Sequence, residues 1–297
     1  MVRIHPCSSC IQRKLSSLPL TIEWIWFLLQ GTIMTISKDF VGASNGLIWI
    51  WLFDYTGARD SLCLWNPATR EYKQIPNPSG EFNRHHVVLH NFCYDHKIDD
   101  YKLAICEAVY GGNSLLHVYT LASNSWKVGK KATYRFPYNM ERRGVLVNAD
   151  FHWLAVAEYK YFLLSLDISD ESFKEMQLPK EFLTTKDPHM VLGELEGCLC
   201  LLMRSYVNGV KIQLEVWEML EFGVPEAWTK RYIISRESII SDQFFLRNAW
   251  SFKNAEILFL GRTSLVLYDP KDGNVTEFKI DNTYYHYAEN YFESLVS

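Results

Sequence analysis

The sequence has no run of basic residues that would make one face of the protein positive. Its 30 lysines and arginines are outnumbered by 34 aspartates and glutamates, and the formal net charge is −4. The basic pairs Lys130-Lys131 and Arg142-Arg143 stand apart from other positive charge. Proteins that bind nucleic acid through its phosphates carry a basic face, so we expect no nucleic-acid partner.

Long apolar runs are also missing. Residues 24–36 (WIWFLLQGTIMTI) are uncharged, but this run is 13 residues long and contains Gln30 and Gly31. A membrane-spanning helix needs about 20 apolar residues. A secretory signal is an alternative, but its nearest small-residue cleavage candidate, residues 41–43, would cut into the first repeat. We therefore expect a buried strand or helix here, no membrane partner, and a cytoplasmic or nuclear location.

The seven cysteines do not form the pattern of a disulfide framework. Their number is odd and their spacings are irregular, which predicts buried free thiols in a reducing compartment. Cys7-Ser-Ser-Cys10 is a CxxC pair, but no second ligand pair at zinc-site spacing accompanies it. A redox role would require a βαβ context, which the flanking sequence does not indicate.

Catalytic motifs are absent as well, since the chain contains no GxSxG, no phosphate loop and no HExxH. A metal site is conceivable where His85, His86 and His90 precede the acidic run 95–100. However, a strand over these histidines would place His86 and His90 on one face and His85 on the other. The acidic run DHKIDD is typical of a turn. We predict no catalytic residue, no metal and no cofactor.

Aromatic residues, in contrast, are abundant at 15% of the chain, and their flat rings favour β-strands. One pattern recurs five times: an apolar strand, a short polar turn, and a second strand that begins near an aromatic residue. Successive copies begin 54, 46, 52 and 51 residues apart, and they span residues 62–76, 116–129, 162–179, 214–234 and 265–280.

A further strand pair precedes each of these hairpins, as in residues 43–53, where an Asn-Gly dipeptide is a strong turn signal. In four copies the matching positions across the turn are six residues apart. In the fourth copy the interval is ten, from residue 218 to residue 228, and Gly223 and Pro225 mark a longer turn. Each repeat therefore predicts two hairpins, or four strands.

Four-stranded units at a period near fifty residues are typical of propeller blades and are closest to the kelch period. We predict an all-β fold, a β-propeller of four-stranded kelch-like blades. Five blades can be read directly, and the ring has five or six. A two-sheet sandwich is the competing fold, but it does not explain the recurrence.

A propeller enzyme, either carbohydrate-active or oxidising, is the alternative in another class of function. Asp167, Asp170 and Glu171 would suggest a carboxylate pair for such chemistry. The position of Asp167 is occupied by Asn66 and Thr120 in other copies, so these side chains are expected to cap turns.

The ordered series of motifs resembles the plant F-box-associated domain, type 1, over roughly residues 42–297. The resemblance rests on GASNGLIWIW…LCLWNPATREYKQIP (42–76), YDHKIDDYKLA (94–104), VYTLASNSWK (118–127), GVLVNADFHWLA (144–155), LLSLDISDESFKEMQLP (163–179), GCLCLL (197–202), EVWEMLEFGVPEAWTK (215–230), LVLYDPKDGNVTEF (265–278) and ESLVS (293–297). It implies a substrate-recognition domain of a cullin–RING (SCF-type) ubiquitin ligase, without catalytic residues of its own.

In that family an N-terminal F-box binds a Skp-type adaptor. An F-box would read as a Leu-Pro-rich trio of helices, and residues 1–41 contain only Leu18-Pro19-Leu20 and a tryptophan-rich run. We therefore divide the chain into an atypical segment, 1–41, and a propeller domain, 42–297. Adaptor binding is expected only if an F-box lies upstream. A truncated gene product with no independent role is a further alternative.

The partner is expected to be a target protein, bound by loops that the repeat does not explain. These loops are residues 55–60, 134–143, 206–211 and 220–226. The second mixes aromatic residues with arginine, a composition typical of interface hot spots. The predicted protein-binding residues are Tyr134, Arg135, Phe136, Tyr138, Arg142 and Arg143.

Overall fold

A computed structural model of the chain describes most of the repeat region. The described residues are 36–54, 60–78, 86–109, 113–132, 134, 136, 144–157, 160–179, 182, 190–207, 210–235, 248–251, 255–260 and 264–279. The run 24–36, expected to be a buried strand or helix, and the pair Cys7 and Cys10 lie outside these residues, apart from Ile36 at the start of the first strand.

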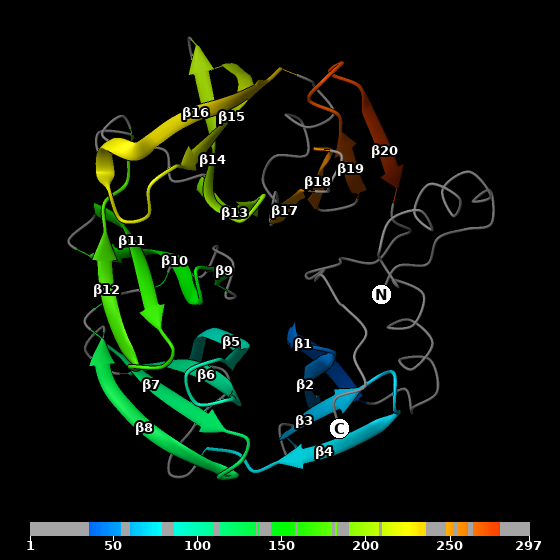
Figure 1. Cartoon of the computed structure of the whole chain (residues 1–297), viewed down its shortest axis with the longest axis vertical. Helices are drawn as coiled ribbons and strands as arrows, with labels where there is room; N and C mark the ends of the chain where they lie inside the picture. Colours follow the sequence, from blue (N-terminus) through cyan, green and yellow to red (C-terminus); the bar gives the residue numbers. More distant parts are fainter. Residues whose placement is uncertain are drawn as a thin grey trace. The chain divides into compact units, whose positions relative to one another are not determined.

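The described residues form twenty β-strands and no α-helix (Figure 1). The first two sheets comprise β1 (Ile36–Ser44), β2 (Leu47–Asp54), β3 (Asp60–Asn66) and β4 (Glu71–Ile75), then β5 (Val87–Asp95), β6 (Asp100–Val109), β7 (Asn113–Thr120) and β8 (Ser125–Ala132). The third comprises β9 (Val145–Val147), β10 (Asp150–Ala157), β11 (Lys160–Asp167) and β12 (Ser172–Met176). In each sheet, consecutive strands pair in antiparallel fashion.

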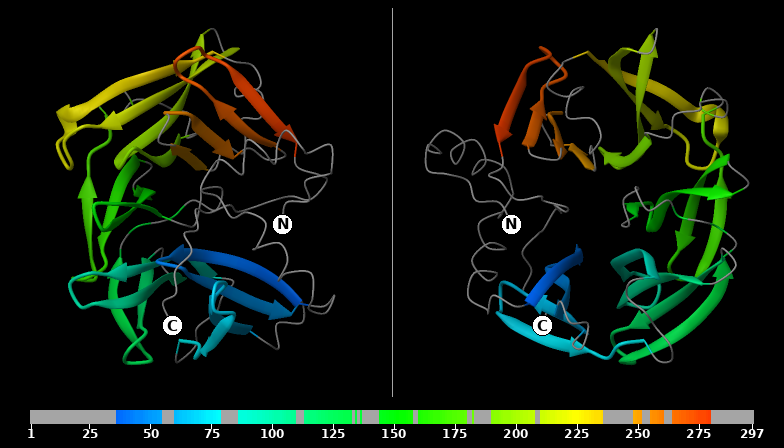
Figure 2. Two further views of the ribbon diagram at one scale, coloured as in Figure 1. Left: turned by 45° about the vertical axis from the view of Figure 1, so that its right-hand side comes forward. Right: turned by 180° about the vertical axis from the view of Figure 1, so that it is seen from behind.

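The remaining strands form one eight-stranded sheet. They are β13 (Met190–Leu195), β14 (Cys198–Val207), β15 (Val210–Met219), β16 (Trp228–Ile234), β17 (Asn248–Ser251), β18 (Ile257–Leu260), β19 (Ser264–Tyr268) and β20 (Val275–Lys279). Its halves meet through one parallel bridge, Glu194 to Trp250, so it consists of two antiparallel four-stranded sheets. The predicted five repeats of four strands are thus confirmed, and they can be followed from two further directions in Figure 2.

The contacts divide the described residues into two compact units, each with its own core. The first holds β1–β8 together with the short segment Ile168–Glu171, and the second holds β9–β20. In the first unit Trp49 packs against Phe92 and Tyr119, with ring centroids 5.6 and 5.9 Å apart. Alternate apolar residues of the strands fill these cores, as period-two patterning requires.

The turns explain why the strands stay in register. Among the described residues, nine non-glycine residues and four glycines have positive φ, and all of these lie in the first-to-second and third-to-fourth turns of the sheets. The predicted Asn45-Gly46 turn is among them, with φ of 45° and 82°. Asn66 also caps its turn, since its Oδ1 accepts a hydrogen bond from the Ala68 N–H at 2.9 Å.

The start of the first strand and the length of one turn can be compared with the boundaries expected from the sequence. β1 begins at Ile36, upstream of the strand pair expected at 43–53, and runs across residues 41 and 42. The division into 1–41 and 42–297 stays a prediction. The pairs that close the third-to-fourth turn are five residues apart in the first sheet, Asn66 with Glu71, and nine apart in the fourth, Met219 with Trp228. The longer fourth turn is confirmed.

Within the described residues, no helix is both long and apolar enough to cross a membrane.

Candidate functional site

The third residue of the second strand can be compared across the first four sheets. It is Trp49 in β2, Lys102 in β6, His152 in β10 and Cys200 in β14. All four side chains are buried. The same position therefore carries an aromatic ring, an ammonium group, an imidazole or a thiol, and its surroundings must satisfy a different chemistry in each sheet.

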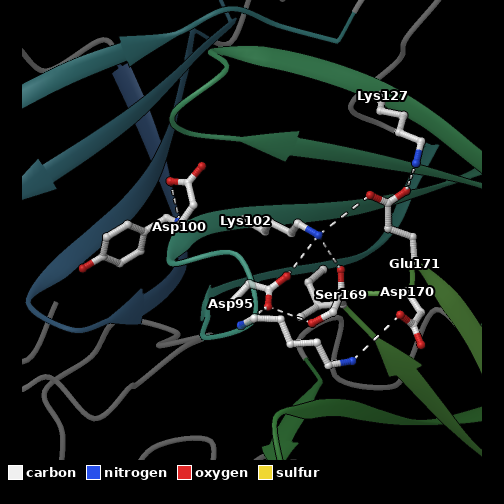
Figure 3. Close-up of polar contacts among 10 residues, drawn as sticks. Asp95, Asp100, Lys102, Lys127, Ser169, Asp170 and Glu171 are labelled. Atoms are coloured by element: carbon white, nitrogen blue, oxygen red, sulfur yellow. Dashed lines mark hydrogen bonds and ion pairs between the residues drawn. The ribbon is translucent and has the colours of Figure 1, made fainter.

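Lys102 has the most polar of these surroundings, and all of its partners lie in the first compact unit (Figure 3). Its Nζ lies 3.1 Å from Asp95 Oδ2 and donates a hydrogen bond to the Ile168 carbonyl oxygen at 2.9 Å. The side chains of Lys102 and Asp95 are 5% and 1% exposed. Ser169 Oγ donates to the other oxygen of Asp95 at 2.7 Å. A buried ion pair thus holds the segment Ile168–Glu171.

Outer charges continue this cluster toward solvent. Glu171 lies 3.9 Å from Lys102 Nζ and 2.7 Å from Lys127 Nζ. Lys97 and Asp170 form a longer and exposed pair at 3.8 Å. Acidic and basic side chains alternate along the cluster, so the charges compensate one another within the protein (Figure 3).

The electrostatics favour a permanently charged pair. Burial of the Asp95 carboxyl group raises its pKa, but the hydrogen bonds from Ser169, Lys102 and the Lys97 backbone N–H outweigh burial, and the pKa is lowered overall. Asp95 is therefore ionised at neutral pH opposite the Lys102 ammonium. Such a pair can position a turn, but it is poorly suited to proton transfer.

A second buried cluster lies in the same unit, where His117 Nε2 is 3.3 Å from Glu107 Oε2. His86 Nδ1 approaches the other oxygen of Glu107 at 3.9 Å from an exposed position. Burial lowers the pKa of His117, and Glu107 partly opposes this effect. His117 is therefore neutral at physiological pH, and the contact is a hydrogen bond rather than a full ion pair.

Two residues of the metal-site alternative, His86 and Asp95, lie in different clusters. β5 begins at Val87, so His86 lies outside the strand, and the register shifts between Val87 and Leu89. The expected regular alternation from His86 to His90 is wrong for this reason. Asp95 lies at the opposite end of β5 and pairs with Lys102. In the part of the chain that the structure describes, no group of three or more His, Cys, Asp or Glu is arranged to hold a metal ion.

The predicted interface at 134–143 is described at two positions. Tyr134 donates a hydrogen bond from its hydroxyl group to Glu175 Oε1 at 2.7 Å. Burial of the Tyr134 hydroxyl group, and to a smaller extent its contact with Glu175, raises the pKa of Tyr134 to about 12. Phe136 is buried. Arg135, Tyr138, Arg142 and Arg143 lie outside the described residues. The assignment of these six residues to protein binding stays a prediction.

The fourth predicted loop, 220–226, lies within the described residues, and the structure extends it by one residue to Ala227. The 220–227 loop connects β15 to β16 and is braced by its own backbone. Leu220 N–H donates to the Ala227 carbonyl at 3.1 Å and Val224 N–H to the Glu221 carbonyl at 3.2 Å. Gly223, with φ of +80°, donates to the sulfur of Met219 at 3.3 Å. A short 3₁₀ turn, Pro225–Ala227, completes the loop.

This loop presents apolar side chains to solvent. Leu220 is 64% exposed and Phe222 is 39% exposed. The Phe222 ring lies edge-on to His152, with centroids 5.3 Å apart. Burial lowers the pKa of His152 to about 4, and its Nδ1 lies 3.1 Å from the Val145 carbonyl oxygen. A neutral, fixed imidazole therefore supports Phe222.

Acidic side chains surround the base of the loop. Arg231 Nη1 pairs with Glu218 Oε1 at 2.7 Å, and Nη2 pairs with Glu196 in the β13–β14 turn. Glu221 and Glu226 are exposed on the loop itself. The loop thus combines exposed apolar side chains with acidic ones, and ion pairs lie at its base.

The central residues of the other two predicted loops, 55–60 and 206–211, are not among the described residues. Residues 55–59, between β2 and β3, and 208–209, between β14 and β15, lie outside the described residues. Their role in binding stays a prediction.

The described cysteines are free, as expected from their spacing: Cys63, Cys93, Cys106, Cys198 and Cys200. Burial raises the pKa of Cys93 and of Cys106 to about 12. Such thiols are inert, because the thiolate is the reactive form.

Sequence reasoning missed two of the polar anchors. Lys102 is a charged residue at a position between apolar residues of β6, and this mismatch was a usable signal. Arg231 lies at a register shift between β15 and β16, and no local pattern marks that shift. Its partners Glu196 and Glu218 lie 35 and 13 residues away in the sequence.

Comparisons with known proteins agree with the repeat architecture. A family model described as "F-box associated beta propeller domain" matches residues 29–297. The Arabidopsis thaliana F-box protein At3g07870 is 27% identical, over 98% of this chain and 77% of its own length. F-box protein CPR1 from the same plant is also 27% identical, over 86% of this chain and 67% of its own length.

Among solved structures, an exo-β-1,3-galactanase from Phanerochaete chrysosporium aligns with a TM-score of 0.48 and 9% identity, over 84% of this chain and 63% of that chain. A likeness this weak supports no statement about activity. The family match covers most of the chain, including all twenty strands, and confirms the predicted β-propeller. The chain belongs to the F-box associated beta propeller domain family.

Proposed function

We propose that this chain is the target-recognition domain of a cullin–RING ubiquitin ligase, and that it binds a partner protein through loops of its propeller. The observation that carries this proposal is the family match over residues 29–297, together with relatives that are named F-box proteins. In this proposal the strands provide a rigid scaffold, and the turns provide the surface that distinguishes one target from another.

We also propose that the chain has no catalytic activity and needs no cofactor. Among the described residues, buried Asp95 pairs with buried Lys102, and buried Glu218 pairs with the partly exposed Arg231. Buried Cys93 and Cys106 have raised pKa values and are poor nucleophiles. Transfer of ubiquitin would then belong to other subunits, and this chain would contribute binding alone.

Capture of the target and coupling to the ligase are separate properties, and one experiment can distinguish them. The purified chain and an F-box-bearing relative are immobilised and tested for binding of a recombinant Skp-type adaptor. We expect the relative to bind the adaptor and this chain to bind it weakly or not at all, because residues 1–41 lack the Leu-Pro-rich pattern of an F-box.

Target binding is tested by proximity labelling with the chain in plant cells. We expect a reproducible set of labelled proteins in the cytoplasm or nucleus that a control propeller of another family does not label. If labelling matches that of the control propeller, the recognition role is refuted. Strong adaptor binding by this chain would instead contradict only the expected uncoupling from the ligase.

A further inference from the structure

The 220–227 loop departs from the repeat in both length and composition. The strand pairs that close the third-to-fourth turn are five residues apart in each of the first three sheets. Here they are nine apart, from Met219 to Trp228. The additional residues are not needed to connect two antiparallel strands, because the shorter turns achieve the same connection. Their presence requires another explanation.

We propose that this loop is the contact site for a partner segment that carries apolar side chains flanked by lysine or arginine. The proposal rests on the proposed function, since it identifies which surface of the recognition domain meets the target and the chemistry of the segment bound. It is based on three features of the loop: its rigidity, its exposed apolar pair and its charge.

The loop is ordered before any partner arrives. Three backbone hydrogen bonds close it on itself: from Leu220 to Ala227, from Val224 to Glu221 and from Ala227 to Val224. Gly223 adds the bond to Met219, a residue of the buried core. A loop held in this way loses little conformational entropy when it binds, so more of its contact energy is available for affinity.

Leu220 and Phe222 lie two residues apart on one loop, and both are among the exposed large apolar residues that the structure describes. The others are Tyr72, Ile98, Val128, Leu146 and Ile233, which lie in separate strands or turns. Single exposed apolar residues are ordinary on protein surfaces, whereas adjacent ones indicate a contact site. The Phe222 ring also packs edge-on against the neutral ring of His152.

The charged side chains of the loop itself are acidic. The loop contains Glu221 and Glu226 and no basic residue. At its base Arg231 pairs with both Glu196 and Glu218, so one positive group faces two carboxylates. Complementary charge steers association and excludes partners of the wrong sign. A basic and apolar segment fits this surface, whereas an acidic segment would be repelled.

The proposal is tested with defined peptides on the full chain. Fluorescein-labelled peptides of equal length are made in pools that combine leucine and phenylalanine with lysine and arginine, the same apolar residues with aspartate, or serine with lysine and arginine. Binding is followed by fluorescence polarisation to the native chain, to Leu220→Ser, and to the double variant Glu221→Lys/Glu226→Lys. Thermal melts establish that each variant is folded.

Ile233→Ser is the matched control, because Ile233 is 52% exposed on β16 of the same sheet and lies outside the loop. We expect the apolar–basic pool to bind best. Each loop variant should weaken that binding by about tenfold or more, and the control should not. Added salt should weaken the native interaction, because screening acts on exposed charges.

The inference is overturned if no pool binds, if the pools bind equally, or if Ile233→Ser weakens binding as much as Leu220→Ser does. These results would leave the recognition role intact as long as proximity labelling still reports specific targets. If labelling also fails, the proposed function itself fails, so the two outcomes can be told apart.

Discussion

Replacing Lys102 with methionine is expected to destabilise the protein strongly, although the substitution changes one side chain of similar length. The change removes the ammonium group 3.1 Å from Asp95 and the hydrogen bond to the Ile168 carbonyl. Asp95 is 1% exposed, so its charge cannot be satisfied by water in the folded protein. Removing one partner of a buried ion pair typically costs about 3–5 kcal/mol of unfolding free energy.

The measurement is urea denaturation followed by tryptophan fluorescence, with the loss of unfolding free energy taken from the shift of the midpoint. Lys97→Met is the matched control. Lys97 and Asp170 are 63% and 65% exposed and 3.8 Å apart. Exposed pairs contribute below about 1 kcal/mol, so this variant should unfold close to the native midpoint.

A double variant tests the cause. Asp95→Asn together with Lys102→Met removes both charges, and much of the lost stability should return, because no unpaired carboxylate remains buried. The reasoning is refuted if Lys102→Met costs no more than Lys97→Met. It is also refuted if the double variant is as unstable as the sum of its two single variants.

Further predictions concern pH and thiol reactivity. The folded-state pKa of Asp95 is lowered, so the contribution of Asp95 to stability is present above the unfolded pKa of about 3.9 and is lost as the pH falls through the folded value. Asp95→Asn should therefore flatten that part of an acid-unfolding curve. An unchanged slope would contradict this prediction. The pKa of His152 is lowered to about 4, so the unfolded state binds the additional proton between about 6.5 and 4, and stability should fall as the pH is lowered through this window. His152→Leu should remove that dependence in pH-resolved thermal melts. Cys106, whose pKa is raised to about 12, should resist a thiol reagent such as DTNB in the native protein and react only on unfolding; rapid labelling of Cys106 in mass spectrometry of the folded chain would contradict its burial.

The repeat and its hairpins could be predicted because they depend on local chemistry. Asn45-Gly46 adopts the positive φ values of a tight turn, and the sequence motif indicates this without knowledge of any partner strand. The longer turn before Trp228 was visible in the spacing of the fourth copy for the same reason. The irregular start of β5 could not be predicted from the sequence, because the register shift near Val87 depends on pairing with β6.

The candidate site was predicted less well. The loop at 220–226 was one of four candidates, but the sequence favoured the loop at 134–143 because of its aromatic and arginine residues. The structure shows Leu220 exposed, Phe222 resting on His152 and Phe136 buried. Exposure and support depend on what lies beneath a side chain, and a loop sequence does not contain that information.

By itself, the sequence determined the period of the repeat, the four-stranded unit and the places where the chain turns, because these follow from apolar alternation and from the backbone preferences of single residues. The tertiary structure alone decided how the buried polar groups are satisfied. Lys102 meets the carbonyl oxygen of a residue 66 positions away, and Asp95 meets Ser169 across 74. A strand pattern can place a lysine on an inward face, but its partner is set by how separate segments pack together in space.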